Sequence, residues 1–168
     1  MDKVNNKIKF KKMVSWILVI LWMITVFCFS SQVGDESKAS SGNTIRRIVL
    51  FFNSNISVYK LEEIVESLQP FTRKLAHFTI YTIGGFILYN LNNKYDNSQK
   101  RKIAFSFLLG LMYAITDEIH QFFVPGRSCR IFDVFVDSCG VITGILLYIS
   151  MLKIIDRMLK NKTKKVNK

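Results

Sequence analysis

Half of the side chains that could do chemistry lie in one stretch, AITDEIHQFFVPGR at residues 114–127, directly after the apolar run IAFSFLLGLMY. Carboxylates and imidazoles such as those of Asp117, Glu118 and His120 serve as general acids and bases or as metal ligands. Asp117, His120 and Gln121 have i, i+3, i+4 spacing, which places them on one helix face, whereas Glu118 points about 100° away from Asp117. The stretch therefore predicts a helix with one functional face.

Two other apolar stretches also carry polar residues along one helical face. Lys74, His77 and Tyr81 are spaced i, i+3, i+7, and Asp133 and Asp137 are four residues apart. Both spacings place the side chains on one side of a helix. A charged side chain that faces lipid costs at least a few kcal/mol, so we expect the polar faces to meet.

Arg127 joins these candidates because the VPGR turn brings it near Asp133 and Glu118, and it could pair with either. The candidate catalytic residues are His77, Asp117, Glu118, His120 and Asp133. The candidate binding residues are Lys74, Tyr81, Gln121, Arg127 and Asp137. His77, Asp117 and His120 are candidate metal ligands, although the sequence has no HExxH spacing and requires no cofactor. A salt-bridged latch, a metal site and general acid–base catalysis all stay open as interpretations.

Four apolar stretches must position these residues: residues 13–29, 71–91, 103–123 and 131–152. Each is about 17–22 residues long, enough to cross a hydrocarbon core of ~30 Å. The chain has 168 residues, is 49% hydrophobic and carries a net charge of +12. Basic segments that flank long apolar runs indicate a membrane protein and not a nucleic-acid binder. Three cysteines without a CxxC pair argue against a zinc module or a disulfide framework.

The distribution of basic residues predicts how the chain crosses the membrane. Sixteen of the 24 Lys and Arg residues precede the first stretch, separate the second from the third, or follow the fourth. Such flanks face the cytoplasm, so we predict a multi-pass membrane protein with both termini cytoplasmic. Residues 1–12 would form a basic N-terminus, residues 13–152 a four-span domain, and residues 153–168 a basic tail that touches anionic lipid head groups.

The loop between the first two spans has about 40 residues, too long for a structureless connection. Two sets of its apolar residues have helical spacing: Ile45, Ile48, Val49 and Phe52, and then Leu61, Ile64, Val65 and Leu68. They predict two short amphipathic helices, lying on the outer membrane surface or capping the bundle, with Pro70 separating the second from the next span. The predicted fold is an all-α membrane protein with four transmembrane helices and two short amphipathic helices in the first extracytoplasmic loop.

The polar residues also share a depth. Counted from the expected cytoplasmic ends of their spans, His77, Asp117 and Asp137 lie roughly 21–22 Å along the helices. All three fall about 8–9 Å below the outer surface of a ~30 Å core. The sequence therefore predicts one polar layer near the outside of the membrane.

These residues resemble the VanZ-like family of small membrane proteins, from the end of the first span to the middle of the fourth. FSSQ at residues 29–32 is similar to the Ser-Ser-Gln that follows the family's first span. RKLAHFTIY at residues 73–81 resembles its Lys-x-x-His-Phe-x-x-Tyr motif. TDEIHQFFVPGRSCRIFDV at residues 116–134 resembles Asp-Glu-x-x-Gln-x-Phe-x-Pro-x-Arg followed by Asp. Gly140 and Gly144 match the family's paired glycines, which let another helix approach closely.

Two positions depart from the family pattern: Ile80 stands where many relatives carry Glu, and Asp137 where many carry Asn. The second adds a negative charge or a protonated carboxyl to the site. The resemblance implies a bacterial cell-envelope protein. The family's named member is associated with low-level resistance to teicoplanin, a glycopeptide with a fatty acyl tail, but the resemblance implies no particular reaction.

Three functions follow as hypotheses. In the first, the outer polar site binds a lipid-linked or lipopeptide head group, with Lys74 and Arg127 holding anionic groups and the loop helices controlling access. In the second, the protein is a membrane-embedded, metal-dependent or metal-free enzyme acting on a lipid or cell-wall precursor, with His77 or His120 as acid and base. A transporter is the weakest, because the spans show no inverted repeat. Membrane lipids are expected partners, and a homo-oligomer stays open.

Overall fold

The computed structural model describes the backbone of residues 2–166 and the side chains of residues 5–163. This part of the chain consists of five helices without a strand: α1 (Asp2–Ser30), α2 (Gly34–Phe52), α3 (Val58–Asn92), α4 (Gln99–Phe122) and α5 (Ile131–Val166). The all-α prediction is confirmed. Three helical segments are long and apolar enough to cross a membrane: Asn5–Ser30, Gln99–Phe122 and Ile131–Thr163.

The predicted second span, residues 71–91, lies within α3 but is not among those three segments. Its apolar character is diluted by Arg73, Lys74, His77 and several Thr and Asn residues, as expected of a helix that turns polar groups toward its neighbours. The number of transmembrane helices therefore stays a prediction.

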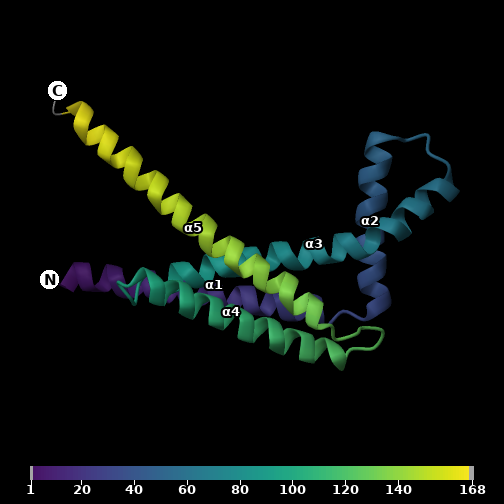
Figure 1. Cartoon of the computed structure of the whole chain (residues 1–168), viewed down its shortest axis with the longest axis horizontal. Helices are drawn as coiled ribbons and strands as arrows, with labels where there is room; N and C mark the ends of the chain where they lie inside the picture. Colours follow the sequence, from purple (N-terminus) through teal and green to yellow (C-terminus); the bar gives the residue numbers. More distant parts are fainter. Residues whose placement is uncertain (1, 167–168) are drawn as a thin grey trace.

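Figure 1 shows how the chain distributes its connections between the two ends of the bundle. Both termini and the turn between α3 and α4 lie at one end, whereas α2 and the connection between α4 and α5 lie at the other. Helix α2 runs steeply across the other helices, and the C-terminal part of α5 diverges from them. The polar stretch at residues 114–127 thus lies at the end opposite the termini.

Close packing between α3 and α5 aligns the polar faces of these two helices. A Cβ atom added at Gly140 would lie 2.6 Å from the carbonyl oxygen of Phe78, and one at Gly144 would overlap the carbonyl oxygen of Thr82. No larger residue fits there without separating the helices, as the GxxxG pattern predicts. This contact places the turn of α5 that carries Asp137 beside the turn of α3 that carries His77.

The outer faces of α1, α4 and α5 carry many exposed large apolar side chains, including Trp16, Ile20, Ile24, Leu108, Met112, Leu146 and Leu147. Their apolar partners inside the bundle form a core from α1, α3, α4 and α5, centred on Trp22, Tyr81, Ala114, Val141 and Ile145. Contiguous apolar surface of this extent is not tolerated in water but fits a hydrocarbon environment. The packing therefore agrees with a membrane protein.

The prediction that Pro70 separates a short amphipathic helix from the second span is wrong. Helix α3 runs without interruption from Val58 through Pro70 and bends beside α2 in Figure 1. A proline inside a helix removes one hydrogen bond and strains the preceding turn, at a cost of about 3 kcal/mol. Burial of Leu61 and Val65 against Ile45 of α2 favours continuation of the helix and offsets that cost.

The other loop helix and the predicted tail also have new bounds. The set of Ile45 to Phe52 lies in α2, which starts already at Gly34 and is joined to α3 by a bidentate pair between Arg46 and Glu62 at 2.8 and 2.6 Å. Helix α5 continues beyond residue 152, the predicted end of the fourth span, to Val166. Residues 153–166 of the predicted tail are thus part of helix α5.

Candidate functional site

A cavity of about 270 Å³ opens at the end of the bundle opposite the termini, between α2, α3, α5 and the connection from α4 to α5. Five basic side chains line it: Lys38, Arg73, Lys74, Arg127 and Arg130. Acidic and imidazole groups line it as well, namely His77, Asp133 and Asp137. The cavity therefore combines a basic wall with a small group of carboxylates and one imidazole.

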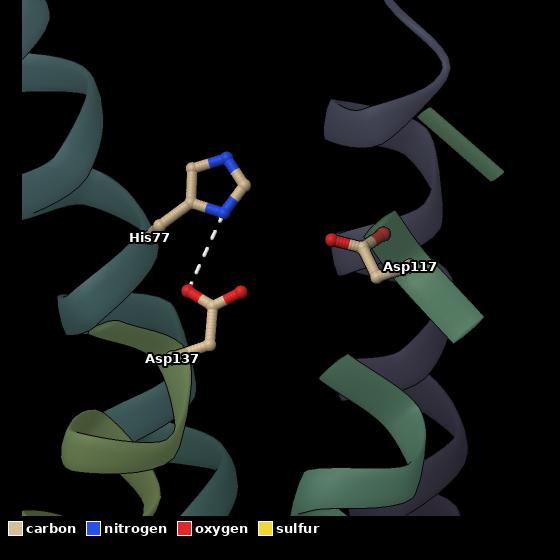
Figure 2. Close-up of side chains that lie close together, drawn as sticks. All are labelled: His77, Asp117 and Asp137. Carbon is tan, nitrogen blue, oxygen red and sulfur yellow. Dashed lines mark ion pairs between the residues drawn. The ribbon is translucent and has the colours of Figure 1, made fainter. Parts of the chain in front are cut away.

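His77 of α3, Asp117 of α4 and Asp137 of α5 converge beside this cavity (Figure 2). One nitrogen or oxygen atom from each lies within 4.8 Å of those of the other two. The Nδ1 atom of His77 is 3.5 Å from Oδ1 of Asp137, and the Asp117 carboxylate points toward this pair from across the gap. Three helices thus each contribute one ionisable side chain, as expected of polar faces that avoid lipid.

The carboxylate of Asp117 is held in place by two neighbours. The Ser30 hydroxyl donates to Oδ1 of Asp117 at 2.5 Å, and the Gln121 side-chain amide donates to Oδ2 at 3.1 Å. All three side chains are buried. Because donors on two different helices fix both of its oxygens, the Asp117 carboxylate has a defined orientation toward the cavity side of α4.

The expected pairing of Arg127 with Asp133 or Glu118 is wrong. Its guanidinium donates instead to the carbonyl oxygens of Gln32 at 2.9 Å and Phe29 at 2.8 Å, and to Oε1 of Gln121 at 3.1 Å. Phe29 lies in the last turn of α1 and Gln32 just beyond it, where a helix leaves carbonyl acceptors without internal partners. Arg127 therefore closes the end of α1 and, through Gln121, supports Asp117.

Glycine allows this connection to reach α1. The backbone nitrogen of Gly34 donates to the carbonyl oxygen of Pro125 at 3.0 Å, and a Cβ atom at Gly34 would overlap the carbonyl oxygen of Gly126. Gly126 itself has φ of 74°, a conformation that favours glycine. The close approach thus excludes a side chain at Gly34, and the positive φ disfavours one at Gly126.

Two further predicted catalytic residues, Glu118 and His120, make contacts outside the group of three, whereas Asp133 lines the cavity. Glu118 is buried, and its Oε2 accepts the backbone N–H of Arg130 at 2.9 Å, which positions the connection before α5. His120 turns toward α1, with Nε2 at 3.1 Å from the Ser31 hydroxyl and its ring 4.7 Å from that of Phe27. The structure therefore does not bring His120 together with Asp117.

Of the predicted binding residues, Tyr81 lies in the core of the bundle and Lys74 lines the cavity. Tyr81 is fully buried and packs edge-on against the ring of Trp22 with centroids 5.7 Å apart. Lys74 lines the cavity, with its ammonium 4.2 Å from the ring centroid of Phe132, as in a cation–π contact.

Several buried polar atoms in this region have no hydrogen-bond partner among the described residues: Nδ1 of His77, the Tyr81 hydroxyl, Oδ1 of Asp133 and both carboxylate oxygens of Asp137. Leaving such a group without a partner costs about 1–3 kcal/mol, and more when the group is charged. Buried polar groups in proteins are nearly always satisfied, so their accumulation at one place marks a site that a ligand can complete.

Burial lowers the pKa of the Arg127 guanidinium from its usual value, and the nearby positive charge of Arg73 lowers it further. Like charges that approach within a cavity disfavour each other's charged forms. The five Lys and Arg side chains that line the cavity thus carry more positive charge than the carboxylates of Asp133 and Asp137 can balance.

Sequence reasoning missed Ser30 as a partner of Asp117 and missed Lys38, Arg73 and Arg130 as cavity residues. A signal existed for Ser30, because two serines and a glutamine end an otherwise apolar helix. No such signal marked Lys38, since its approach to the cavity depends on how α2 folds back across the bundle.

Comparison with known proteins identifies a family. A family model described as VanZ/LLP1 matches residues 15–154, a range that includes every residue of the cavity and of the group around Asp117. No curated protein and no solved structure matches the chain.

Proposed function

Because this chain belongs to the VanZ/LLP1 family and has the apolar helices of a membrane protein, we propose that its cavity binds the anionic head group of a lipid-linked or lipopeptide molecule in the bacterial cell envelope. The observation that carries this proposal is the basic wall of the cavity, with five Lys and Arg side chains. A head group bearing phosphate or carboxylate would complement that wall.

The available donors narrow the binding residues. Arg127 has its guanidinium nitrogens bonded to Gln32, Phe29 and Gln121, so it contributes charge more than free donors. No carboxylate in the described part of the chain forms an ion pair with Arg73, Lys74 or Arg130. Arginine binds phosphate and carboxylate groups in a bidentate manner, which makes Arg73 and Arg130 the principal contacts.

The proposed topology has four transmembrane helices and two cytoplasmic termini, which puts the cavity on the outer side. Both termini and the turn between α3 and α4 share one end of the bundle, and these segments contain most of the basic residues. Positive charge of this kind is retained in the cytoplasm. Helix α3 would cross the membrane inside the bundle, where its polar face meets α4 and α5 instead of lipid.

Helix α2 and the first part of α3 would lie at the outer membrane surface and control access to the cavity. Phe51 and Phe52 of α2 and Val58 and Tyr59 of α3 are largely exposed around the turn that joins these helices. Apolar side chains at such a tip suit the boundary between head groups and acyl chains. A lipid-linked ligand could then keep its tail in the membrane while its head group enters the cavity.

The proposed physiological consequence is selective resistance to teicoplanin, whose fatty acyl tail distinguishes it from vancomycin. A susceptible bacterial host would carry an empty vector, wild type, Arg73→Gln or Arg47→Gln, with membrane levels matched by immunoblot. Arg47 is the control because it is exposed on α2 and does not line the cavity. We expect wild type and Arg47→Gln to raise the inhibitory concentration of teicoplanin alone, and Arg73→Gln to lose at least half of that increase.

Two results would count against the proposal. Full protection by Arg73→Gln at equal membrane level would show that the basic wall does not bind the relevant head group. Accessibility of single cysteines near both termini to an impermeant reagent in intact cells would reverse the topology. The cavity would then face the cytoplasm.

A membrane-embedded enzyme that acts on a lipid or cell-wall precursor is the second candidate. The observation that favours it is the convergence of one imidazole and two carboxylates beside the basic cavity. A product that forms with wild type and disappears with Asp117→Asn would support catalysis over binding alone.

A further inference from the structure

The carboxylate of Asp137 is the least satisfied polar group in the described part of the chain. Its side chain has an exposed fraction of 0%, and neither of its oxygens has a hydrogen-bond partner there. Nδ1 of His77 lies 3.5 Å from Oδ1 of Asp137, longer than an ordinary hydrogen bond. A buried carboxylate in this position requires a partner, because an isolated buried charge is strongly disfavoured.

We propose that His77, Asp117 and Asp137 together bind one divalent metal ion of the manganese or zinc type. The geometry that points to it is the approach of one ligand atom from each residue to within 4.8 Å of the other two. Metal–ligand bonds of about 2.0–2.2 Å put two ligands of one tetrahedral ion ~3.4 Å apart, so the three ligand atoms must each move toward a common centre by up to ~1 Å to complete the site. Ligands from three helices would make the ion a link between α3, α4 and α5.

The neighbours of the ligands already hold one of them in a binding orientation. Ser30 and Gln121 donate to the two oxygens of Asp117, and Arg127 in turn donates to Gln121. Metal-binding carboxylates are commonly oriented by such hydrogen bonds from surrounding residues. Asp117 is therefore already oriented as a ligand. The oxygens of Asp137 accept no hydrogen bond in the described chain and are free to bind the ion.

The ligand types select the class of metal ion. Two carboxylates carry two negative charges that balance one divalent cation, and no Lys or Arg in the described chain forms an ion pair with either of them. An imidazole ligand favours zinc and other transition metals over magnesium and calcium, whereas carboxylates suit manganese. Three protein ligands leave at least one coordination position open.

That open position adjoins the basic cavity. His77 and Asp137 both line the cavity, and the side chain of His77 is 25% exposed, so the ion would be reachable from it. An anionic group in the cavity could then contact the ion with one oxygen and Arg73 with another. Metal binding by the three residues does not itself require the head group, so it stands or falls separately from the proposed function.

A latch between His77 and Asp137 alone is the competing explanation. It accounts for their proximity, but it leaves Oδ2 of Asp137 without a hydrogen-bond partner in the described chain. It also gives no reason for the Asp117 carboxylate to point toward them from α4. A shared metal ion gives the Asp137 carboxylate a cationic partner and accounts for the position of Asp117.

The test measures Mn²⁺ binding by the full-length protein in detergent micelles, purified with a tag that contains no histidine. Mn²⁺ is the primary probe because the three cysteines could bind Zn²⁺ elsewhere in the chain. The protein is stripped with a chelator, equilibrated with Mn²⁺ and desalted, and its metal content is measured by mass spectrometry. His77→Gln and Asp137→Asn test the site, and His120→Gln is the matched control because His120 lies on α4 outside the group of three.

We expect one Mn²⁺ per chain for wild type and His120→Gln, and at least tenfold weaker binding for His77→Gln and Asp137→Asn. Equal binding by wild type and both site variants would overturn the proposal, as would the absence of binding by wild type at millimolar Mn²⁺. Tryptophan fluorescence, to which Trp22 packed on Tyr81 contributes, reports whether each variant is folded. If both site variants fail to fold, electron spin echo spectra of wild type decide: one coordinating imidazole nitrogen supports the site, and none refutes it.

Discussion

Polar side chains are buried or half-buried at both ends of this bundle, but the buried polar atoms without a hydrogen-bond partner in the described chain all lie at one end. At the end near the termini, Ser15, Asn90, Lys94 and Tyr148 form what we call the far cluster. Asn90 donates to Ser15 at 3.2 Å and accepts from Tyr148 at 2.9 Å and from Lys94 at 3.2 Å, and Lys94 also donates to Ser15. No described buried atom of the far cluster is without a partner.

The opposite end has what we call the site cluster: His77, Tyr81, Asp117 and Asp137. Asp117 is satisfied by Ser30 and Gln121, whereas Nδ1 of His77, the Tyr81 hydroxyl and the Asp137 carboxylate have no hydrogen-bond partner in the described chain. Both clusters bury polar side chains, so burial alone does not identify a functional site. We infer that a network whose members are all hydrogen-bonded to one another stabilises the fold. A cluster whose buried polar atoms have no hydrogen-bond partners is instead arranged to bind a ligand.

Arg127 is the exception at the site end, because all three nitrogens of its guanidinium are hydrogen-bonded and it stabilises the fold, as the far cluster does. Arg127→Ala would remove three hydrogen bonds from a charged donor and leave the carbonyls of Phe29 and Gln32 at the end of α1 without it. We expect the free energy of unfolding to fall by about 3–5 kcal/mol, a larger effect than any substitution in the far cluster would have. Unfolding in mixed detergent micelles, followed by tryptophan fluorescence, measures it.

Arg127→Lys is the control for this prediction, since it keeps the charge and loses the planar fork of donors. If Arg127 acted only by charge, Lys would restore most of the stability. We expect Lys to restore less than half. Full restoration would show that the bonds to the end of α1 are unimportant, and Arg127 would return to the set of head-group contacts.

The convergence of the site cluster follows from elementary rules applied to the sequence. Apolar runs of the length of a membrane crossing locate α1, α4 and α5 to within a few residues, apart from the helical extensions into the basic flanks. Charged residues avoid lipid, and equal distances from the helix ends put His77, Asp117 and Asp137 in one layer. The structure has their ligand atoms within 4.8 Å of one another.

The sequence-based expectations for His120, Arg127 and Pro70 are wrong because tertiary contacts determine where these residues lie. Gln121 and His120 both share a broad face with Asp117, but at 100° per residue they lie about 40° and 60° to opposite sides of it. Gln121 turns into the site, and His120 turns to α1. The partners of Arg127 depend on where α1 ends in space, and continuation of α3 through Pro70 depends on packing against α2. No local pattern in the sequence contains that information.

The far cluster gives the second-largest expected effect. Asn90→Ala would leave Ser15, Lys94 and Tyr148 each with one bond fewer, at a cost of about 2–3 kcal/mol in the same unfolding assay. Tyr148→Phe removes one of these bonds and is expected to cost about 1 kcal/mol. If Asn90→Ala lowered the free energy of unfolding by less than Tyr148→Phe does, water would replace the lost hydrogen bonds. The far cluster would then not be a structural network.

Asp137→Ala gives the smallest expected effect and the sharpest contrast with Asn90→Ala. The substitution removes a buried carboxylate that has no hydrogen bond in the described chain, and it leaves only a small cavity. In metal-free protein we expect a change in the free energy of unfolding within about 1 kcal/mol of zero, of either sign. The assay is run in a chelator, because an ion bound to wild type would add stability that the variant lacks. A loss as large as that of Asn90→Ala would mean that Asp137 already has a structural partner, most directly His77. The far cluster and the site cluster would then differ in their residues, but both would serve to stabilise the fold.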